Sequence, residues 1–136
     1  MLKVLQPAGW SKPRGYSNGI AARGTTIHVA GQVGWNSQCQ FESDDFAQQA
    51  GLALRNIVAV LREAQAGPEH IVRMTWYVTS KKEYLGAGKA LGNAYREAMQ
   101  MPDGQISYPA MTAVEVTALI EDRAKVEIEV TAVVPD

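Results

Sequence analysis

The sequence has little cysteine and no long apolar run, and each shortage excludes a class of protein. Cys39 is the only cysteine among 136 residues, so an internal disulfide cannot form and a thiol-based metal site lacks ligands. No segment approaches the roughly 20 apolar residues that cross a bilayer, and the opening residues are too short for the apolar region of a signal peptide. We therefore expect a soluble protein in a reducing, cytoplasmic setting, without membrane contact.

Neither sign of charge is in clear excess. The 13 basic and 14 acidic residues are mixed along the chain and give a formal net charge of −1, without a basic segment that could follow a phosphate backbone. Nucleic-acid binding is therefore not expected. The two histidines, His28 and His70, are far apart in the sequence and lack ligand spacing, so the sequence predicts no metal site.

The length and composition of the chain predict one compact domain spanning residues 1–136. Hydrophobic residues make up 46% of the sequence and can fill a core. The clearest pattern lies in residues 108–134. Residues 125–132 alternate strictly, with apolar side chains on one face and polar ones, including Glu127, on the other. Because the interruption at residues 121–123 has turn character, we predict two long strands paired as neighbours in an antiparallel hairpin.

The remaining segments predict a sheet with two amphipathic helices. We expect a short strand at residues 2–5, a hairpin of residues 16–22 and 25–33, a helix from Ser43 to about residue 66, a central strand at residues 70–79 and a helix at residues 82–100. The order β-β-β-α-β-α-β-β predicts an α+β fold, a mixed β-sheet with both helices on one face. The bare face then needs a partner, and we expect it to carry Met111, Ala113, Glu115, Glu127 and Glu129.

Glycines mark two places where we expect close approach of other groups. Gly31, between Ala30 and Gln32, permits a backbone or ligand to come near the strand. Gly86, Gly88 and Gly92 weaken the second helix by roughly 1 kcal/mol each relative to alanine, so they are expected to mark contact between helix and sheet.

Several short motifs occur together in a fixed order. They are Gly15-Tyr16, Ala30-Gly31-Gln32, the two helices, residues 108–116 (YPAMTAVEV) and residues 125–129 (KVEIE). In order and spacing, over nearly the whole chain, they resemble the RidA family, also called YjgF or reactive intermediate deaminase. The resemblance implies a chorismate-mutase-like homotrimer with a small-molecule site at each subunit interface. It also implies hydrolysis of an enamine or imine to a ketone and ammonia, without a metal or an organic cofactor.

Two residues match polar positions of the family's site and are the candidate catalytic residues. Glu127, in the last strand, could position or deprotonate the water that attacks an imine carbon. Tyr16, after the first loop, could hydrogen-bond the substrate or protonate a leaving group. The alternatives are a salt-bridged strand glutamate and a half-buried strand tyrosine with a satisfied hydroxyl.

Three other positions depart from the family pattern. Ala30, Met111 and Ala113 stand where the resemblance implies a serine, an arginine and a cysteine. A thioether has neither the charge nor the paired donors of a guanidinium, so a substrate of the 2-aminoacrylate type is not expected. Met111 is either an apolar wall of a remodelled pocket or a packing residue at an interface. Arg14 could supply anion binding or be a solvated loop residue. The candidate substrate-binding residues are Met111, Ala30, Gly31, Ala113 and Arg14.

These observations leave three functional hypotheses. The first is a hydrolytic deaminase of an enamine or imine that does not depend on the usual arginine. The second is a non-catalytic trimer that binds a metabolite or has a regulatory role, which the departures at Ala30, Met111 and Ala113 favour. The third is an endoribonuclease, a label attached to some members of the family, for which charge and composition supply no RNA groove.

Overall fold

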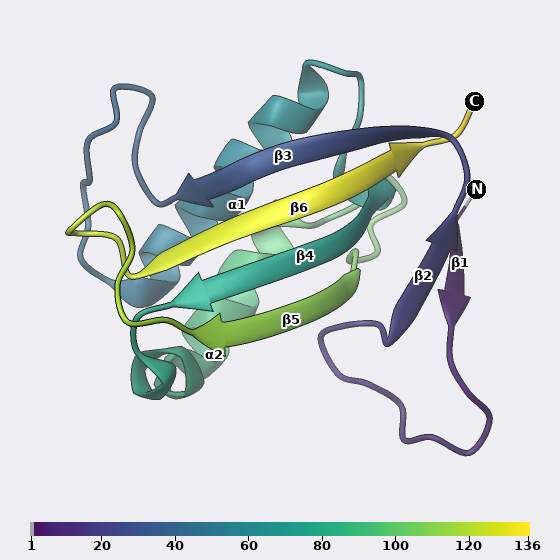
Figure 1. Ribbon diagram of the computed structural model, residues 1–136, viewed down its shortest axis with the longest axis horizontal. Coiled ribbons are helices and arrows are strands. Elements are labelled where there is room, and N and C mark those ends of the chain that lie inside the picture. Colours follow the sequence, from purple (N-terminus) through teal and green to yellow (C-terminus); the bar gives the residue numbers. More distant parts are fainter. Residues whose placement is uncertain (1) are drawn as a thin grey trace.

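A computed structural model describes residues 2–136 and has the predicted order of elements (Figure 1). The strands are β1 (Leu2–Leu5), β2 (Gly19–Ala22), β3 (Thr25–Val33), β4 (Ile71–Val78), β5 (Ala110–Glu115) and β6 (Val126–Val134). The helices are α1 (Phe46–Arg62) and α2 (Lys81–Ala98), with a short 3-10 turn, η1 (Pro68–His70), before β4. The predicted α+β class is confirmed.

The main sheet has four strands in the order β3-β6-β4-β5, and β1 pairs with β2 in a separate ribbon. Neighbouring strands are antiparallel except β4 and β5, which run parallel, so the sheet is mixed as predicted. Strand β4 lies inside the sheet, which confirms that its nearly continuous apolar sequence marks a central strand.

Both predicted hairpins are wrong. Strand β4 lies between β5 and β6, and β2 pairs with β1 while β3 pairs with β6. Alternation identifies a strand and its two faces but not its neighbour. Helix α2 connects β4 to β5 and returns the chain to the same end of the sheet, which is the connection that a parallel pair requires.

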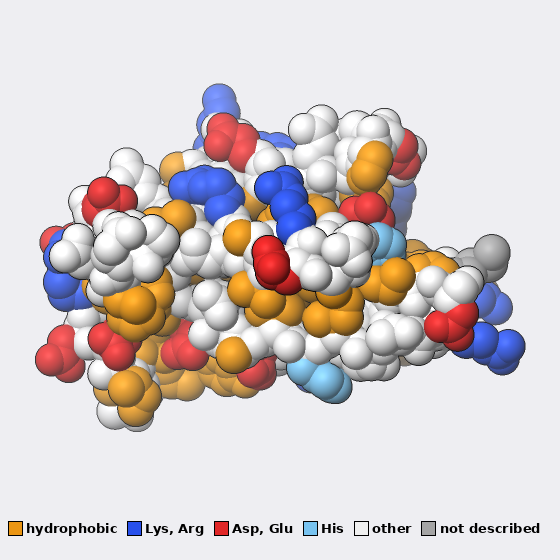
Figure 2. Space-filling model, turned by 90° about the horizontal axis from the view of Figure 1, so that it is seen from above, with side chains coloured by type: hydrophobic (Ala, Val, Ile, Leu, Met, Phe, Trp, Pro, Cys, Tyr) orange, Lys and Arg blue, Asp and Glu red, His pale blue; other side chains and the backbone are white. Residues whose placement is uncertain are grey.

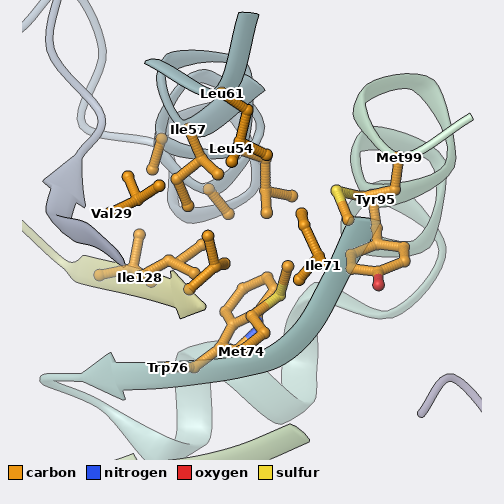
Figure 3. Close-up of a cluster of buried hydrophobic side chains, with 14 of the residues drawn as sticks. Val29, Leu54, Ile57, Leu61, Ile71, Met74, Trp76, Tyr95, Met99 and Ile128 are labelled. Atoms are coloured by element: carbon orange, nitrogen blue, oxygen red, sulfur yellow. The ribbon is translucent and has the colours of Figure 1, made fainter. Parts of the chain in front are cut away.

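Both helices cover the same face of the main sheet, as predicted (Figure 1). The apolar side chains of β6 point toward them and are fully buried at Val126, Ile128 and Ala132. Figure 3 shows Trp76 and Met74 of β4 in the same core as the α1 leucines and isoleucine. The predicted apolar stripe of α1 is therefore confirmed, because its residues Ala50, Ala53, Leu54, Ile57 and Leu61 are all buried in this core.

The ends of α1 differ from the prediction. Asp45, not Ser43, is the N-cap, and its carboxylate accepts a hydrogen bond from the Gln48 backbone at 3.0 Å. Ser43 instead supports the cap, because its hydroxyl oxygen accepts a hydrogen bond from the Asp45 amide at 3.0 Å. The helix ends at Arg62, several residues before Gly67.

Helix α2 is kinked at Gly88, where φ is +48° and ψ is −119°. L-residues rarely adopt this conformation, so glycine suits the kink. The expected close approach to the sheet is not found at Gly86 or Gly88, where an added Cβ atom would meet nothing within 4 Å. At Gly92 the neighbour is the Arg96 guanidinium.

Candidate functional site

A cavity of about 490 Å³ lies beside α2 and the β5 edge of the sheet. The segment before β2 forms one side, α2 forms another, and side chains of β4 and β5 form the base. Four predicted site residues line this cavity: Arg14, Tyr16, Met111 and Ala113. The structure therefore brings together residues that are almost 100 positions apart in the sequence.

The loop before β2 is anchored to the start of β5 by Ser17. The Ser17 amide donates a hydrogen bond to the Pro109 carbonyl at 3.0 Å, and its hydroxyl donates to the Tyr108 carbonyl. Gly15, with φ of +79°, allows the turn that precedes this anchor. Tyr16 consequently lies at the cavity rather than in a strand, and its side chain is 41% exposed.

Strand β5 presents Met111 and Ala113 to the cavity. In the parallel pairing, Met111 lies opposite Met74 and Ala113 opposite Trp76, and both β4 residues are buried in the core under the helices. The expectation that Met111, Ala113 and Glu115 share the bare face of the sheet with Glu127 is therefore wrong, since Glu115 lies opposite the buried Val78. The side chains of a strand alternate between faces, and the register with β4 assigns these three to the helix side.

Aromatic rings form much of the cavity wall. Tyr95 and Tyr108 are stacked, with ring centroids 5.5 Å apart, and Tyr84 meets Trp76 edge to face at 6.0 Å. The Tyr95 hydroxyl donates a hydrogen bond to the Ser107 carbonyl at 2.7 Å. Burial, reinforced by Tyr108, raises the pKa of Tyr95 far above its ordinary value, so this hydroxyl stays protonated.

The cavity carries positive charge only. Arg14 and Arg96 line it, and no Asp or Glu of the described chain does. The Arg96 guanidinium donates to the Asn93 side-chain oxygen at 2.7 Å and lies over Gly92. Arg96 is not among the site residues predicted from the sequence. Its spacing of four and eight residues from Gly92 and Gly88, which also line the cavity, was the available signal.

Glu127 lies on the opposite face of the sheet from this cavity. Its neighbours along β6, Val126 and Ile128, are buried under the helices, so its side chain points to the bare face. There it approaches Gly31: a Cβ atom on that glycine would lie 2.8 Å from the carboxylate carbon of Glu127. The expected close approach at Gly31 is thus found. Ala30 also lies on this side, where it lines a hollow with Arg73 and Glu129.

Tyr77 stands next to the carboxylates of the bare face. It is paired with Glu127 in the register of β4 and β6, and its hydroxyl donates a hydrogen bond to Glu129 at 2.7 Å. That hydrogen bond is the main cause of a raised pKa for Tyr77, followed by desolvation and the charge of Glu129, with a smaller increase from Glu127. The bare face therefore carries a linked set of polar groups.

The predicted site residues thus fall into two groups. Arg14, Tyr16, Met111 and Ala113 line the helix-side cavity, whereas Ala30, Gly31 and Glu127 lie on the bare side of the sheet. Within one chain the sheet separates the two candidate catalytic residues. Any site that uses both Tyr16 and Glu127 takes them from different chains.

Within residues 2–136, no three His, Cys, Asp or Glu side chains are grouped so that they could hold a metal ion. Neither helix of that part of the chain has the length and apolar character of a membrane span. Figure 2 shows acidic and basic side chains interspersed over one face of the molecule, as the mixed charges in the sequence lead one to expect.

Known proteins resemble this chain along most of its length. A family model described as Endoribonuclease L-PSP matches residues 10–134. A RutC family protein of Synechocystis is 31% identical and aligns with 98% of both chains. The Escherichia coli protein named "Putative reactive intermediate deaminase TdcF" is 27% identical over 81% of this chain and 80% of its own. Among solved structures, the Rid-family protein YyfB of Yersinia pestis has a TM-score of 0.81 at 27% identity and covers 98% of each chain.

Proposed function

The chain belongs to the RidA/YjgF family, whose family model is described as Endoribonuclease L-PSP, and we propose that it is a hydrolytic deaminase of small enamines or imines. The name of the TdcF relative supports this reaction class. The observation that carries the proposal is the arrangement of two incomplete half-sites. One is a cavity with Tyr16 at the β5 edge, and the other is Glu127 on the bare face of the sheet.

A second copy of the chain completes the site in this proposal. The bare face has no helix over it, and its polar groups Tyr77, Glu127 and Glu129 are only partly exposed. Strand β5 ends the sheet, and beyond Ala110, which is bridged by Ser17, its outer edge can meet another protomer. The homotrimer expected from the family resemblance would pair the cavity of one protomer with Glu127 of the next, and it would have three equivalent sites.

The reaction needs only acid–base chemistry. A water molecule adds to the carbon of the C=N bond and forms a carbinolamine, while Glu127 takes a proton from that water. The returned proton goes to the nitrogen and completes the carbinolamine; the hydroxyl proton then passes through Glu127 to the nitrogen as the C–N bond breaks, the C=O bond forms and ammonia leaves. One water is consumed and one ketone and one ammonia are formed, without electron transfer. Tyr16 orients the substrate by hydrogen bonding.

Activity on imines is the test of this function. The purified protein is incubated with freshly generated 2-iminopropionate and with neutral or larger imines, and ketone and ammonia release is followed. We expect at least one imine to be hydrolysed faster than in buffer, with Glu127→Gln reducing the rate more than tenfold. Glu97→Gln, on the exposed side of α2, is the matched control and should retain full activity. Full activity of Glu127→Gln on every substrate found would overturn the assignment.

The oligomer is tested separately. Sedimentation equilibrium should give a mass three times that of one chain. Placing charge on the bare face, as in Thr75→Glu, should dissociate it, because this residue lies between Arg73 and Tyr77 on β4 and pairs with Glu129. A monomeric parent protein in dilute solution would contradict a site shared between protomers.

A non-catalytic metabolite-binding role is the second candidate. It is favoured by Ala30, Met111 and Ala113, which stand where the family resemblance implies serine, arginine and cysteine. Native mass spectrometry that finds a retained small molecule, together with no turnover of any imine, would support this role over the enzyme.

A further inference from the structure

We propose that the ligand of the helix-side cavity is an anion with an apolar or aromatic body, and that Arg14 and Arg96 bind its anionic group in place of a cation on β5. This inference deepens the proposed function by specifying the class of substrate, and it rests on that function only in treating the ligand as a substrate. The ligand is a carboxylate in this proposal; a phosphate ester shares the same charge and is separated from it by the experiment below.

The charge of the cavity favours an anionic ligand. Arg14 and Arg96 are its only charged lining residues in the described chain. The ion pairs Arg123–Asp44 and Lys125–Glu83 include neither of these arginines. Arg96 donates to a neutral amide oxygen of Asn93, which leaves most of its five donors free. Two cations without a carboxylate partner favour an anionic ligand.

The position of the two arginines indicates how the ligand is oriented in the cavity. They come from the loop before β2 and from α2, and both residues are exposed. The base of the cavity, by contrast, is formed by Met111, Ala113 and Trp76, which offer no charge. The anionic group is therefore held on the loop and α2 side, and the uncharged part of the ligand points to β5.

The walls and the size of the cavity indicate the nature of the uncharged part of the ligand. Tyr84, Leu85, Leu91 and Tyr108 add apolar and aromatic surface around the base. The cavity volume of about 490 Å³ falls within the roughly 300–1,000 Å³ of typical small-molecule sites. These apolar and aromatic walls favour a ligand that carries a ring or a branched alkyl group over a three-carbon imino acid.

Binding experiments test the inference independently of turnover. Isothermal titration calorimetry of the intact oligomer is performed with phenylpyruvate, pyruvate, the neutral analogue phenylacetone and phenyl phosphate. Phenylpyruvate should bind at least tenfold more tightly than pyruvate or phenylacetone, and its affinity should fall as salt is raised. Tighter binding of phenyl phosphate than of phenylpyruvate would overturn the assignment of a carboxylate.

Variants identify the groups responsible. Arg14→Gln and Arg96→Gln should each weaken phenylpyruvate binding about fivefold to tenfold and leave phenylacetone binding unchanged. Arg62→Gln, at the exposed end of α1, is the matched control and should bind like the parent. Circular dichroism checks that each variant is folded. Absence of measurable binding, or unchanged phenylpyruvate affinity in the double variant Arg14→Gln/Arg96→Gln, would overturn the proposal.

The two proposals fail in different ways. Arginine-dependent binding of phenylpyruvate without turnover of any imine would remove the deaminase function and leave the ligand class intact. Hydrolysis of imines that is insensitive to both arginine substitutions would do the reverse. Glu127→Gln should bind phenylpyruvate as the parent does if that carboxylate acts on water rather than on the anionic group.

Discussion

Gly31 and Glu127 are in contact across β3 and β6, and the space for a side chain at position 31 is occupied by the glutamate. A Cβ atom at Gly31 would lie 2.8 Å from the carboxylate carbon of Glu127 and 2.9 Å from its Cγ. The backbone of Gly31 does not require glycine, because its φ is not positive. The glycine is therefore needed for the position of the Glu127 side chain rather than for the course of the chain.

Gly31→Ala should lower the rate of imine hydrolysis without a comparable loss of thermal stability. The new methyl group displaces the flexible end of the Glu127 side chain rather than backbone, so we expect a thermal midpoint within a few degrees of the parent. The rate of imine hydrolysis should fall at least tenfold, as a misplaced general base predicts. Gly86→Ala, where a methyl group meets nothing within 4 Å, is the control. Parent-like activity of Gly31→Ala would show that the position of Glu127 does not matter.

Gln49 is a buried polar residue whose loss should be costly. Its side chain donates to the carbonyls of Ser43 and Arg123, at 2.9 and 3.0 Å, and accepts from the Lys125 amide at 2.8 Å. Gln49→Leu leaves these backbone groups unpaired and should lower the free energy of unfolding by about 2–4 kcal/mol in denaturant titrations. The exposed neighbour variant Gln48→Leu should change it by less than about 1 kcal/mol.

Gly86 and Gly88 should respond to alanine in opposite directions. Gly88 has a φ of +48°, so Gly88→Ala strains the kink and should destabilise the fold by about 1–3 kcal/mol. Gly86 has ordinary helical geometry and open space, so Gly86→Ala should stabilise it by up to about 1 kcal/mol. Equal effects of the two substitutions in urea unfolding would contradict the kink.

Tyr95 should make the protein sensitive to alkaline pH. Burial keeps its pKa high in the folded state, whereas the unfolded chain releases this proton near pH 10. The unfolded state then binds fewer protons, so stability present at lower pH is lost above about pH 10, by up to about 1.4 kcal/mol per pH unit. Tyr95→Phe should show a shallower loss between pH 10 and 11 in denaturant titrations. At neutral pH it should be about 1 kcal/mol less stable, because the Ser107 carbonyl loses its donor.

The same substitution checks the assignment to Tyr95. A steep loss that persists in Tyr95→Phe would assign the alkaline sensitivity to another group.

The elements of this fold were predictable from local patterns, but their pairing was not. The alternation of residues 125–132 identified β6 and its buried face correctly. It could not show that β4 lies between β5 and β6, because alternation assigns the two faces of a strand and does not specify which strand pairs with it. The helix between β4 and β5 was the relevant signal, since a helical crossover favours a parallel pair.

The site was predicted in part. Arg14, Tyr16, Met111 and Ala113 are neighbours because Ser17 binds the start of β5, a contact between distant segments that no local pattern contains. Arg96 was missed because the sequence pattern predicted one regular helix at residues 82–100 and gave no sign of the cavity that Arg96 lines or of the kink at Gly88. The face of Met111 depended on a register that the sequence alone does not specify.

The central place of β6 has a consequence for synthesis on the ribosome. Strands β3 and β4 both pair with β6 and not with each other, although β6 is the last of the strands to be made. Until residues 126–134 have left the exit tunnel, the edges of β3 and β4 that face β6 are unpaired, and the part of α1 that packs on β6 is uncovered. The main sheet therefore closes only after its translation is essentially complete, and nascent chains that stall before this point are the ones that chaperones must shield.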